Sequence, residues 1–424
     1  MRVDRSWTFA LYAFGTSAAQ ALQCPPLAQH YAFQMIASNI ERGQGAAAST
    51  SGTGLIELGI FYQALRQGIA ATDDTIQKQE WTAYLRNSTA SAIPLFTDAT
   101  LSAQYPLDRF SIGTEMIQQS KERHDDGLNL AIQVLQESLK QQPCNANGGL
   151  WYYNNANNLS AYQNLSYTDG MYSYPTFAIL SSDNSPNDKG LFGSAAVLEQ
   201  LEILKAICDD GTGLLVHGYD ALKYHSWANS ETGASPSVWG RSLAWYTLGV
   251  VEALAALQAS TSSNTILETR IARENMMALL NDLLRAQLIA IERGLAVNGR
   301  YSVWQVVDLP GATINSTQNF VEMSASLMTA YSLLKSARVG FIKESKLRVK
   351  AIAAGIGLWD NVLETQVTRD TNGTLNLGGT SSIASLSPQN VNAEYYSARP
   401  TLNNSLIGTS AFILASLELE KLCS

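Results

Sequence analysis

Residues 243–257 read Leu-Ala-Trp-Tyr-Thr-Leu-Gly-Val-Val-Glu-Ala-Leu-Ala-Ala-Leu, an apolar run that contains a single acid. A helix that is apolar nearly all round is buried, whereas a helix with one apolar stripe lies at the surface. The next segment with helical periodicity, residues 264–290, carries Arg270 and Glu274 on one face. This contrast predicts an inner helix followed by an outer one.

The same alternation extends along the chain and predicts twelve helices that form six pairs. They are expected at residues 30–42, 55–67, 74–87, 108–122, 126–142, 170–182, 189–208, 237–257, 264–290, 319–338, 344–364 and 406–422. Every second helix is rich in small, leucine and aromatic residues, and the helices between them carry charges. Six inner helices ringed by six outer ones predict an all-α fold, an (α/α)6 toroid in one domain spanning residues 22–424. An open helical solenoid is the alternative, but no motif repeats from pair to pair.

Composition excludes several classes of protein. The chain has 424 residues, of which 46% are hydrophobic and 15% charged, and its net charge is −8. A nucleic-acid-binding protein would show a basic stripe, so nucleic acid is not an expected partner. After the N-terminus no segment is long and apolar enough to span a membrane, so no membrane partner is expected either. An anionic ligand would have to be bound by a few local cations.

The N-terminus has the pattern of a secretory signal. Arg2 and Arg5 precede an apolar run at residues 7–19, and small residues up to Ala21 offer a cleavage site, so we expect a signal peptide at residues 1–21. A cytosolic N-terminal helix is the alternative. Six Asn-x-Ser/Thr sequons favour a secreted glycoprotein. They lie at Asn87, Asn158, Asn164, Asn315, Asn372 and Asn403.

Four cysteines fit the same compartment, because an even number is typical of secreted proteins. One arrangement joins Cys24 to Cys423 at the chain ends and Cys144 to Cys208 in the middle, but spacing alone does not fix the pairing. None of the four shows the spacing of metal ligands. We expect an extracellular monomer or homodimer.

Residues 167–175, Tyr-Thr-Asp-Gly-Met-Tyr-Ser-Tyr-Pro, place Asp169 at a turn that enters an apolar helix. An acid there is often an N-cap. In a toroid, however, the inner helices run parallel and the loops that enter them meet at one mouth. Asp108 begins the fourth helix and Arg241 lies in the first turns of the eighth, so all three should face one cavity. Two carboxylates, a guanidinium and aromatic residues are typical of a carbohydrate hydrolase.

Several segments surround the Asp-Gly turn in this arrangement. They are Gly-Gly-Leu-Trp-Tyr-Tyr (148–153), His-Gly-Tyr-Asp (217–220), Trp-Gly-Arg-Ser-Leu-Ala-Trp-Tyr (239–246), Trp-Gln-Val-Val-Asp (304–308), Asn-Phe-Val-Glu-Met-Ser-Ala-Ser (319–326), Leu-Gly-Gly-Thr (377–380) and Glu-Tyr-Tyr (394–396). In their order and spacing the chain resembles glycoside hydrolase family 105, the unsaturated rhamnogalacturonyl hydrolases, over essentially the whole mature chain.

The resemblance implies an (α/α)6 barrel and a reaction without metal or cofactor. The substrate would be a 4,5-unsaturated uronic acid at the non-reducing end of lyase-generated pectic oligosaccharides. Asp169 would protonate C4 and take a proton from the water that adds at C5, which requires a raised pKa. Asp108 matches the family's second acid and would supply a like charge. His217, Arg241 and Trp245 match residues that contact substrate, and an arginine suits a carboxylate because its planar fork binds both oxygens.

Two pairs of neighbouring residues depart from the family pattern. Tyr152 and Tyr153 stand where the family commonly has His-Lys, and Tyr167 and Thr168 stand where it commonly has Trp-Leu. We expect Tyr152 and Tyr167 to line the pocket and contact substrate, which leaves the preference for the neighbouring sugar open.

Three alternatives remain at this point. The first is a family 88 unsaturated glucuronyl hydrolase, which uses the same fold and two acids. The second is an ordinary hydrolase whose paired carboxylates act at the anomeric carbon. The third is a lectin-like protein that binds carbohydrate without catalysis, although binding alone does not require two acids.

Overall fold

The computed structural model describes residues 28–47, 54–154, 160–182, 190–259 and 267–424. The expected signal peptide at residues 1–21, together with Cys24 and Asn158, lies outside the described residues. Within these ranges, no helix combines the length and the apolar character that a membrane span requires.

All twelve predicted helices are present. They are α1 (Ala28–Glu41), α2 (Gly54–Ala71), α3 (Thr75–Ala92), α5 (Arg109–Glu122), α6 (Asp126–Lys140), α7 (Gly170–Ser182), α8 (Gly193–Cys208), α9 (Gly240–Ala259), α10 (Leu267–Asn298), α11 (Met323–Arg338), α12 (Ser345–Gln366) and α14 (Leu406–Cys423). The described residues also form two short helices, α4 (Ala99–Ser102) and α13 (Ala393–Ser397). The predicted all-α fold is confirmed.

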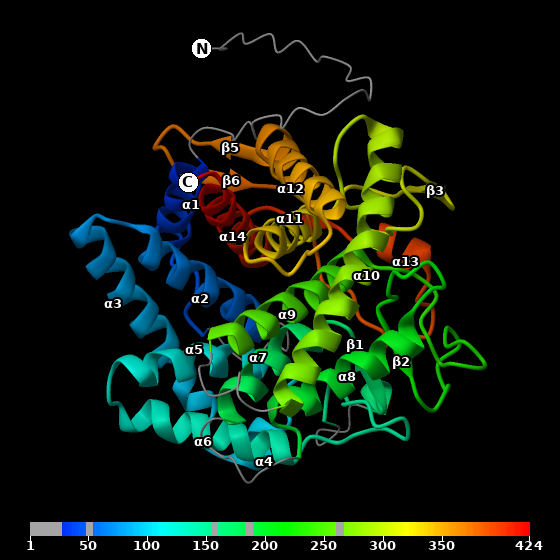
Figure 1. The fold of residues 1–424 in the computed structure, drawn as a ribbon, viewed down its shortest axis with the longest axis horizontal. Helices are drawn as coiled ribbons and strands as arrows, with labels where there is room; N and C mark the ends of the chain where they lie inside the picture. The colour runs from blue at the N-terminus through cyan, green and yellow to red at the C-terminus, as the bar shows by residue number, and fades with distance from the viewer. Residues whose placement is uncertain (1–27, 48–53, 155–159, 183–189, 260–266) are drawn as a thin grey trace.

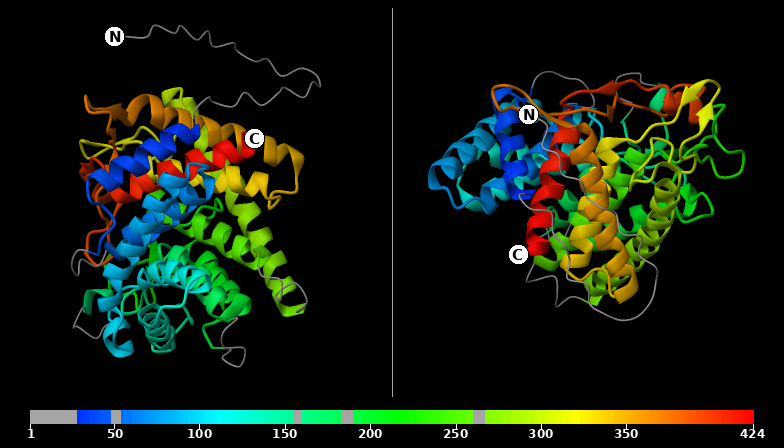
Figure 2. Two further views of the ribbon diagram at one scale, coloured as in Figure 1. Left: turned by 90° about the vertical axis from the view of Figure 1, so that its left-hand side faces the viewer. Right: turned by 90° about the horizontal axis from the view of Figure 1, so that it is seen from above.

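Six helices form a closed inner ring. Each contacts the next in the order α2, α5, α7, α9, α11, α14, and α14 packs back against α2. Figure 1 shows these helices in the middle of the molecule, with α1, α3, α6, α8, α10 and α12 around them. In Figure 2, α14 lies beside α1, so the first and last helices of the described residues meet where the ring closes. The predicted (α/α)6 toroid is therefore correct, and an open solenoid is excluded.

Close packing inside the ring depends on small residues. Pro175 lies within α7 and has no N–H to donate to the carbonyl of Met171, four residues earlier. The backbone of α9 approaches this carbonyl at Gly249, where an added Cβ would lie 1.6 Å from the Met171 oxygen. A side chain at residue 249 would therefore push α7 and α9 apart.

The connections into the inner helices carry all the strands that the described residues form. These strands are β1 (Leu165–Tyr167), β2 (Gly218–Asp220), β3 (Thr313–Ile314), β4 (Thr317–Gln318), β5 (Val367–Arg369), β6 (Leu375–Leu377), β7 (Thr380–Ser381) and β8 (Thr401–Leu402). They pair as antiparallel two-stranded sheets, β1 with β2, β3 with β4, β5 with β6, and β7 with β8. Strands of two or three residues are too short to show alternation, so the sequence did not predict them.

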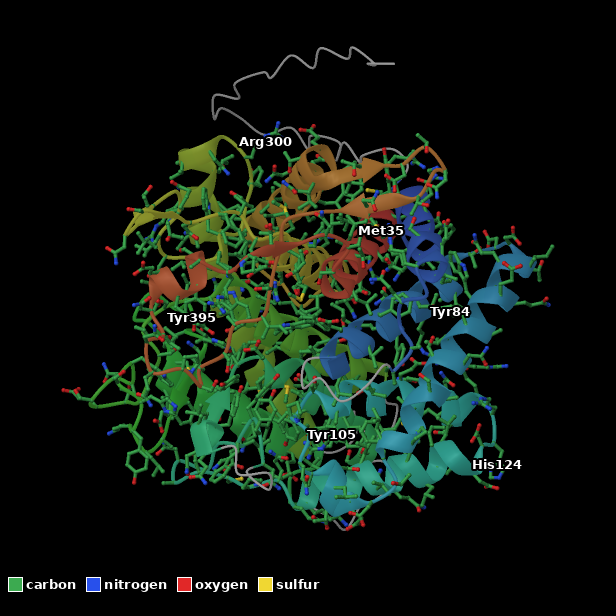
Figure 3. The ribbon with its side chains drawn as sticks, turned by 180° about the vertical axis from the view of Figure 1, so that it is seen from behind. Met35, Tyr84, Tyr105, His124, Arg300 and Tyr395 are labelled. Atoms are coloured by element: carbon green, nitrogen blue, oxygen red, sulfur yellow. The ribbon has the colours of Figure 1, made fainter. Side chains whose placement is uncertain are left out.

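These connections cover one end of the ring. Figure 3, seen from the side opposite to that of Figure 1, shows the chain between α12 and α14 crossing this end, with Tyr395 on α13. Helix α11 starts at Met323 and not at residue 319, because Val321 bridges to Trp304 and the Glu322 side chain caps the helix at Ala325 N. The connections therefore place polar side chains at the N-termini of the inner helices.

The cysteines correct one of the pairings considered above. Cys144 and Cys208 are free thiols, so a disulfide between them is wrong. Cys208 is fully buried at the end of α8, whereas Cys144 is exposed in the loop after α6. Cys423 is disulfide-bonded.

Candidate active site

A cavity opens at the N-terminal ends of the inner helices. About 580 Å³ of space there, including open solvent at the mouth, is not filled by protein atoms. Its lining contains every site residue predicted from the sequence: Asp108, Asp169, His217, Arg241, Trp245, Tyr152 and Tyr167. The structure therefore brings together seven side chains from segments that span more than a hundred residues.

Asp169 sits where strand β1 turns into helix α7. Strand β1 pairs with β2 so that Tyr167 lies opposite Gly218. The N–H of Thr168 donates to the carbonyl of His217 at 3.0 Å, and its hydroxyl donates to the same oxygen at 2.9 Å. In the described part of the chain the Asp169 carboxylate accepts no hydrogen bond from the first turn of α7, so it is not the N-cap that its position suggested. Its carboxylate is available to the cavity.

Asp108 lies deeper in the wall of the same cavity. Its side chain is completely buried, compared with 7% exposure for Asp169. The hydroxyl of Tyr152 donates to Asp108 Oδ2 at 2.7 Å, while Oδ1 is buried without a partner among the described residues. Burial, with a contribution from the charge of Asp169, raises the pKa of Asp108 to about 8, although the Tyr152 hydrogen bond and Arg109 oppose the shift. Asp108 is therefore protonated at neutral pH.

His217 connects Asp169 to a residue that the sequence argument did not select. Its Nε2 lies 3.2 Å from Asp169 Oδ2, and its Nδ1 lies 2.9 Å from the hydroxyl of Tyr396. Burial raises the pKa of Tyr396 well above its usual value, so the hydroxyl keeps its proton. The Tyr396 hydroxyl can therefore donate to Nδ1, whereas the contact between Nε2 and the Asp169 carboxylate is close but not aligned as a hydrogen bond.

Arg241 is held by an acid that the sequence argument also missed. Its Nη2 lies 3.0 Å from Glu322 Oε1, and its Nε donates to the hydroxyl of Ser324 at 3.0 Å. Nη2 also donates to the carbonyl of Ser381, and the guanidinium lies 5.3 Å from the ring of Trp239. Nε and Nη2 are therefore occupied, and Nη1 is the nitrogen with no hydrogen bond to the described residues.

Aromatic rings form the rest of the wall. Tyr152 and Tyr167 stack with centroids 4.5 Å apart and planes 8° from parallel. The hydroxyl of Tyr167 forms a hydrogen bond with Ser385 Oγ and accepts one from Leu386 N, both in the connection before α14. Trp245 packs against Tyr172 with centroids 4.6 Å apart. Flat aromatic faces next to polar groups suit the two faces of a sugar ring.

Tyr396 lies in the segment Glu-Tyr-Tyr and Glu322 in the segment Asn-Phe-Val-Glu. Both segments contribute to the resemblance to glycoside hydrolase family 105, but neither residue was predicted to be in the site. No local signal distinguishes their roles, because Tyr396 meets a histidine 179 residues away and Glu322 meets an arginine 81 residues away.

Comparison with known proteins supports a family assignment. The sequence model for Glycosyl Hydrolase Family 88 matches residues 56–423. Protein Atu3128 of Agrobacterium fabrum is 30% identical over 227 residues, which cover 52% of this chain and 88% of the relative. The 24.9 kDa protein in the picA locus of Rhizobium radiobacter matches with the same identity and coverage.

Two solved structures show the same fold. A family 105 glycoside hydrolase of C. acetobutylicum has a TM-score of 0.74 at 22% identity, over 92% of this chain and 99% of that one. The unsaturated glucuronyl hydrolase of Bacillus sp. GL1 has a TM-score of 0.64 at 14% identity, over 93% of this chain and 96% of that one. With the family model spanning nearly all described helices, the chain belongs to glycosyl hydrolase family 88, the unsaturated glycuronyl hydrolases that share their fold with family 105.

Proposed function

We propose that the protein removes a 4,5-unsaturated uronic acid from the non-reducing end of lyase-generated pectic oligosaccharides, with rhamnogalacturonan fragments as the first candidate substrate. The observation that carries this proposal is the unequal carboxyl pair. Asp169 reaches the cavity, whereas Asp108 is fully buried and holds a proton at neutral pH. A carboxyl group at the surface of the cavity, beside a buried carboxyl group that holds a proton, suits the hydration of a double bond.

Hydration needs a proton for C4 and a base for the water that adds at C5. Asp169 first takes over the proton that Asp108 holds, then gives it to C4 and receives one from the water, so the pair ends with the proton that it began with. Water thereby adds a hydrogen to C4 and a hydroxyl to C5. The C5 hemiketal then opens by breaking its bond to the ring oxygen, and C1, now a hemiacetal, expels the next sugar as an alcohol. His217 Nε2 lies 3.2 Å from Asp169 Oδ2, close enough to contact the carboxylate during both transfers.

The uronate carboxylate is proposed to bind near Arg241. Among the residues that line the cavity in the described part, Arg241 is the only lysine or arginine. Since Glu322 and Ser324 occupy two of its nitrogens, the contact would be made by Nη1 and would not be the two-nitrogen clamp expected from the sequence. Trp245, Tyr152 and the other aromatic side chains would hold the sugar faces.

A binding protein without catalysis is a poorer explanation of this site. A carboxyl group whose pKa is raised from 3.8 to about 8 destabilises the fold at neutral pH, by several kcal/mol on the scale of about 1.4 kcal/mol per pKa unit. Carbohydrate binding does not require such a group, whereas acid chemistry does.

The test follows the ultraviolet absorbance of the double bond, which hydration destroys. Rhamnose-linked and glucuronyl unsaturated disaccharides would be compared with wild type, Asp169→Asn and the exposed-site control Asp126→Asn. We expect decay on the rhamnose-linked substrate in wild type and control, and a loss of at least a thousandfold in Asp169→Asn, in line with removal of an acid–base group. Decay on the glucuronyl substrate alone would move the specificity to the other uronides. Absence of decay on both would refute the proposed reaction.

Secretion is part of the same proposal, because the N-terminal segment and the six sequons favour it. Four sequon asparagines, at residues 87, 315, 372 and 403, are exposed, which is compatible with glycosylation. Mass spectrometry of protein made in a glycosylating host would show glycans at these sites and the N-terminus after residue 21, and an intact, unmodified N-terminus would contradict the proposal.

A further inference from the structure

A second cavity lies inside the ring, towards the C-terminal ends of the inner helices. Its walls come from α2, α5, α7 and α9, and about 880 Å³ of space there is not filled by protein atoms. We call it the far cavity and define it by Gln63, Arg66, Glu115, Tyr172, Thr176 and Glu252. Gln63 and Glu252 lie nine and twelve residues into their helices, so the far cavity is distinct from the active-site cavity at the N-terminal ends.

One layer of aromatic side chains separates the two cavities. Trp245 lines the active-site cavity and Tyr172 lines the far cavity, and their rings contact each other with centroids 4.6 Å apart. The hydroxyl of Tyr172 donates to Gln63 Oε1 at 2.8 Å, on the far side of this layer.

The charged side chains of the far cavity are already paired. Arg66 Nη2 lies 2.7 Å from Glu115, and its Nη1 lies 2.5 Å from Glu122. Glu252 lies 2.7 Å from Lys335 and also accepts a hydrogen bond from Tyr331 at 2.8 Å. A charged ligand would have to break one of these partly buried pairs, which is costly, so the cavity favours a neutral one.

Two polar atoms in the wall lack partners. Gln63 Nε2 and Thr176 Oγ1 make no hydrogen bond to the described residues and are covered by neighbouring protein atoms, but both residues line the cavity, so rotation of either side chain would bring its polar group to a ligand. A buried polar group without a partner costs about 1–3 kcal/mol, so a ligand that satisfies both would be favoured. Ala255, Ala256 and the ring of Tyr172 also line the cavity and offer apolar surface.

We propose that the far cavity binds a neutral, polyhydroxylated molecule of monosaccharide size. Hydroxyl groups would accept from the Gln63 amide and pair with the Thr176 hydroxyl, and the C–H face of a sugar ring would lie on the alanines. The space that a ligand can occupy is about 270 Å³, near the lower end of the range of small-molecule sites. This binding does not depend on the proposed reaction at the other end of the ring.

The test uses rhamnose and galactose as neutral probes and galacturonate as the anionic one, with titration calorimetry and crystals soaked in each sugar. We expect density for a neutral sugar in the far cavity, retained in the active-site variant Asp169→Asn. Thr176→Val, which keeps the shape and removes the hydroxyl, should raise the dissociation constant at least tenfold. Ala256→Met should block binding by filling the space.

Thr114→Val is the matched control. Thr114 lines the same cavity, but its hydroxyl already donates to the carbonyl of Phe110 at 3.1 Å, so binding should change less than threefold. Density for water only in the far cavity would overturn the proposal, as would binding that Asp169→Asn abolishes and Thr176→Val leaves unchanged. Equal binding of galacturonate in the far cavity would refute the argument from paired charges.

Discussion

Replacing Asp108 with asparagine should change how the stability of the protein depends on pH. In the folded protein, burial raises the pKa of this carboxyl group from 3.8 to about 8. Between these values the folded chain binds one proton that the unfolded chain has released, so wild type loses stability as pH rises. Asparagine does not titrate, and its amide oxygen can still accept the hydrogen bond from Tyr152.

The magnitude follows from the interval between the two pKa values. Each pH unit inside it changes the free energy of unfolding by about 1.4 kcal/mol. From pH 5 to pH 8, wild type should therefore lose about 4 kcal/mol relative to Asp108→Asn, in addition to the changes that both proteins share. Denaturant unfolding at pH 5, 6, 7 and 8 measures this difference, provided that the slope with denaturant is the same in both proteins.

Two further variants isolate the cause. Asp126→Asn, at a side chain that is 94% exposed, should follow the wild-type curve. Tyr152→Phe removes a hydrogen bond that lowers the pKa of Asp108, so its loss of stability should continue to higher pH than in wild type. Parallel curves for wild type and Asp108→Asn would mean that the buried carboxyl is ionised at neutral pH, and the proposed division of roles within the pair would then be wrong.

Three other outcomes are expected. Tyr396→Phe should lower kcat about tenfold with little change in KM, because it removes one buried hydrogen bond to His217 and no contact with substrate. Steady-state kinetics measure both constants, and an unchanged kcat would mean that this hydrogen bond is unimportant for the reaction. Gly249→Ala should lower the melting temperature strongly, at a cost above the 1–3 kcal/mol typical of overpacking, while Gly190→Ala, in open space, should not. A maleimide should label Cys144 in the native protein and Cys208 after denaturation without reductant, and peptide mapping that finds them joined would contradict the free thiols.

The fold could be read from the sequence because helical periodicity and burial pattern are local properties. Residues 243–257 show a helix without a polar face, and the charged segment that follows shows one with a single apolar stripe. Repeated along the chain, this contrast was enough to predict the ring. The positions of Asp108 and Asp169 at helix starts then followed, since parallel inner helices place their N-termini at one mouth.

The tertiary structure alone decided what those residues can do. Asp108 holds a proton because the whole fold removes it from water, and no pattern near residue 108 reports that burial. The partners of the site are equally remote, since Tyr396 reaches His217 across 179 residues and Glu322 reaches Arg241 across 81. Hydrogen bonds and pKa shifts depend on which atoms come together in space, so they appear only when segments far apart in the sequence have been packed against each other.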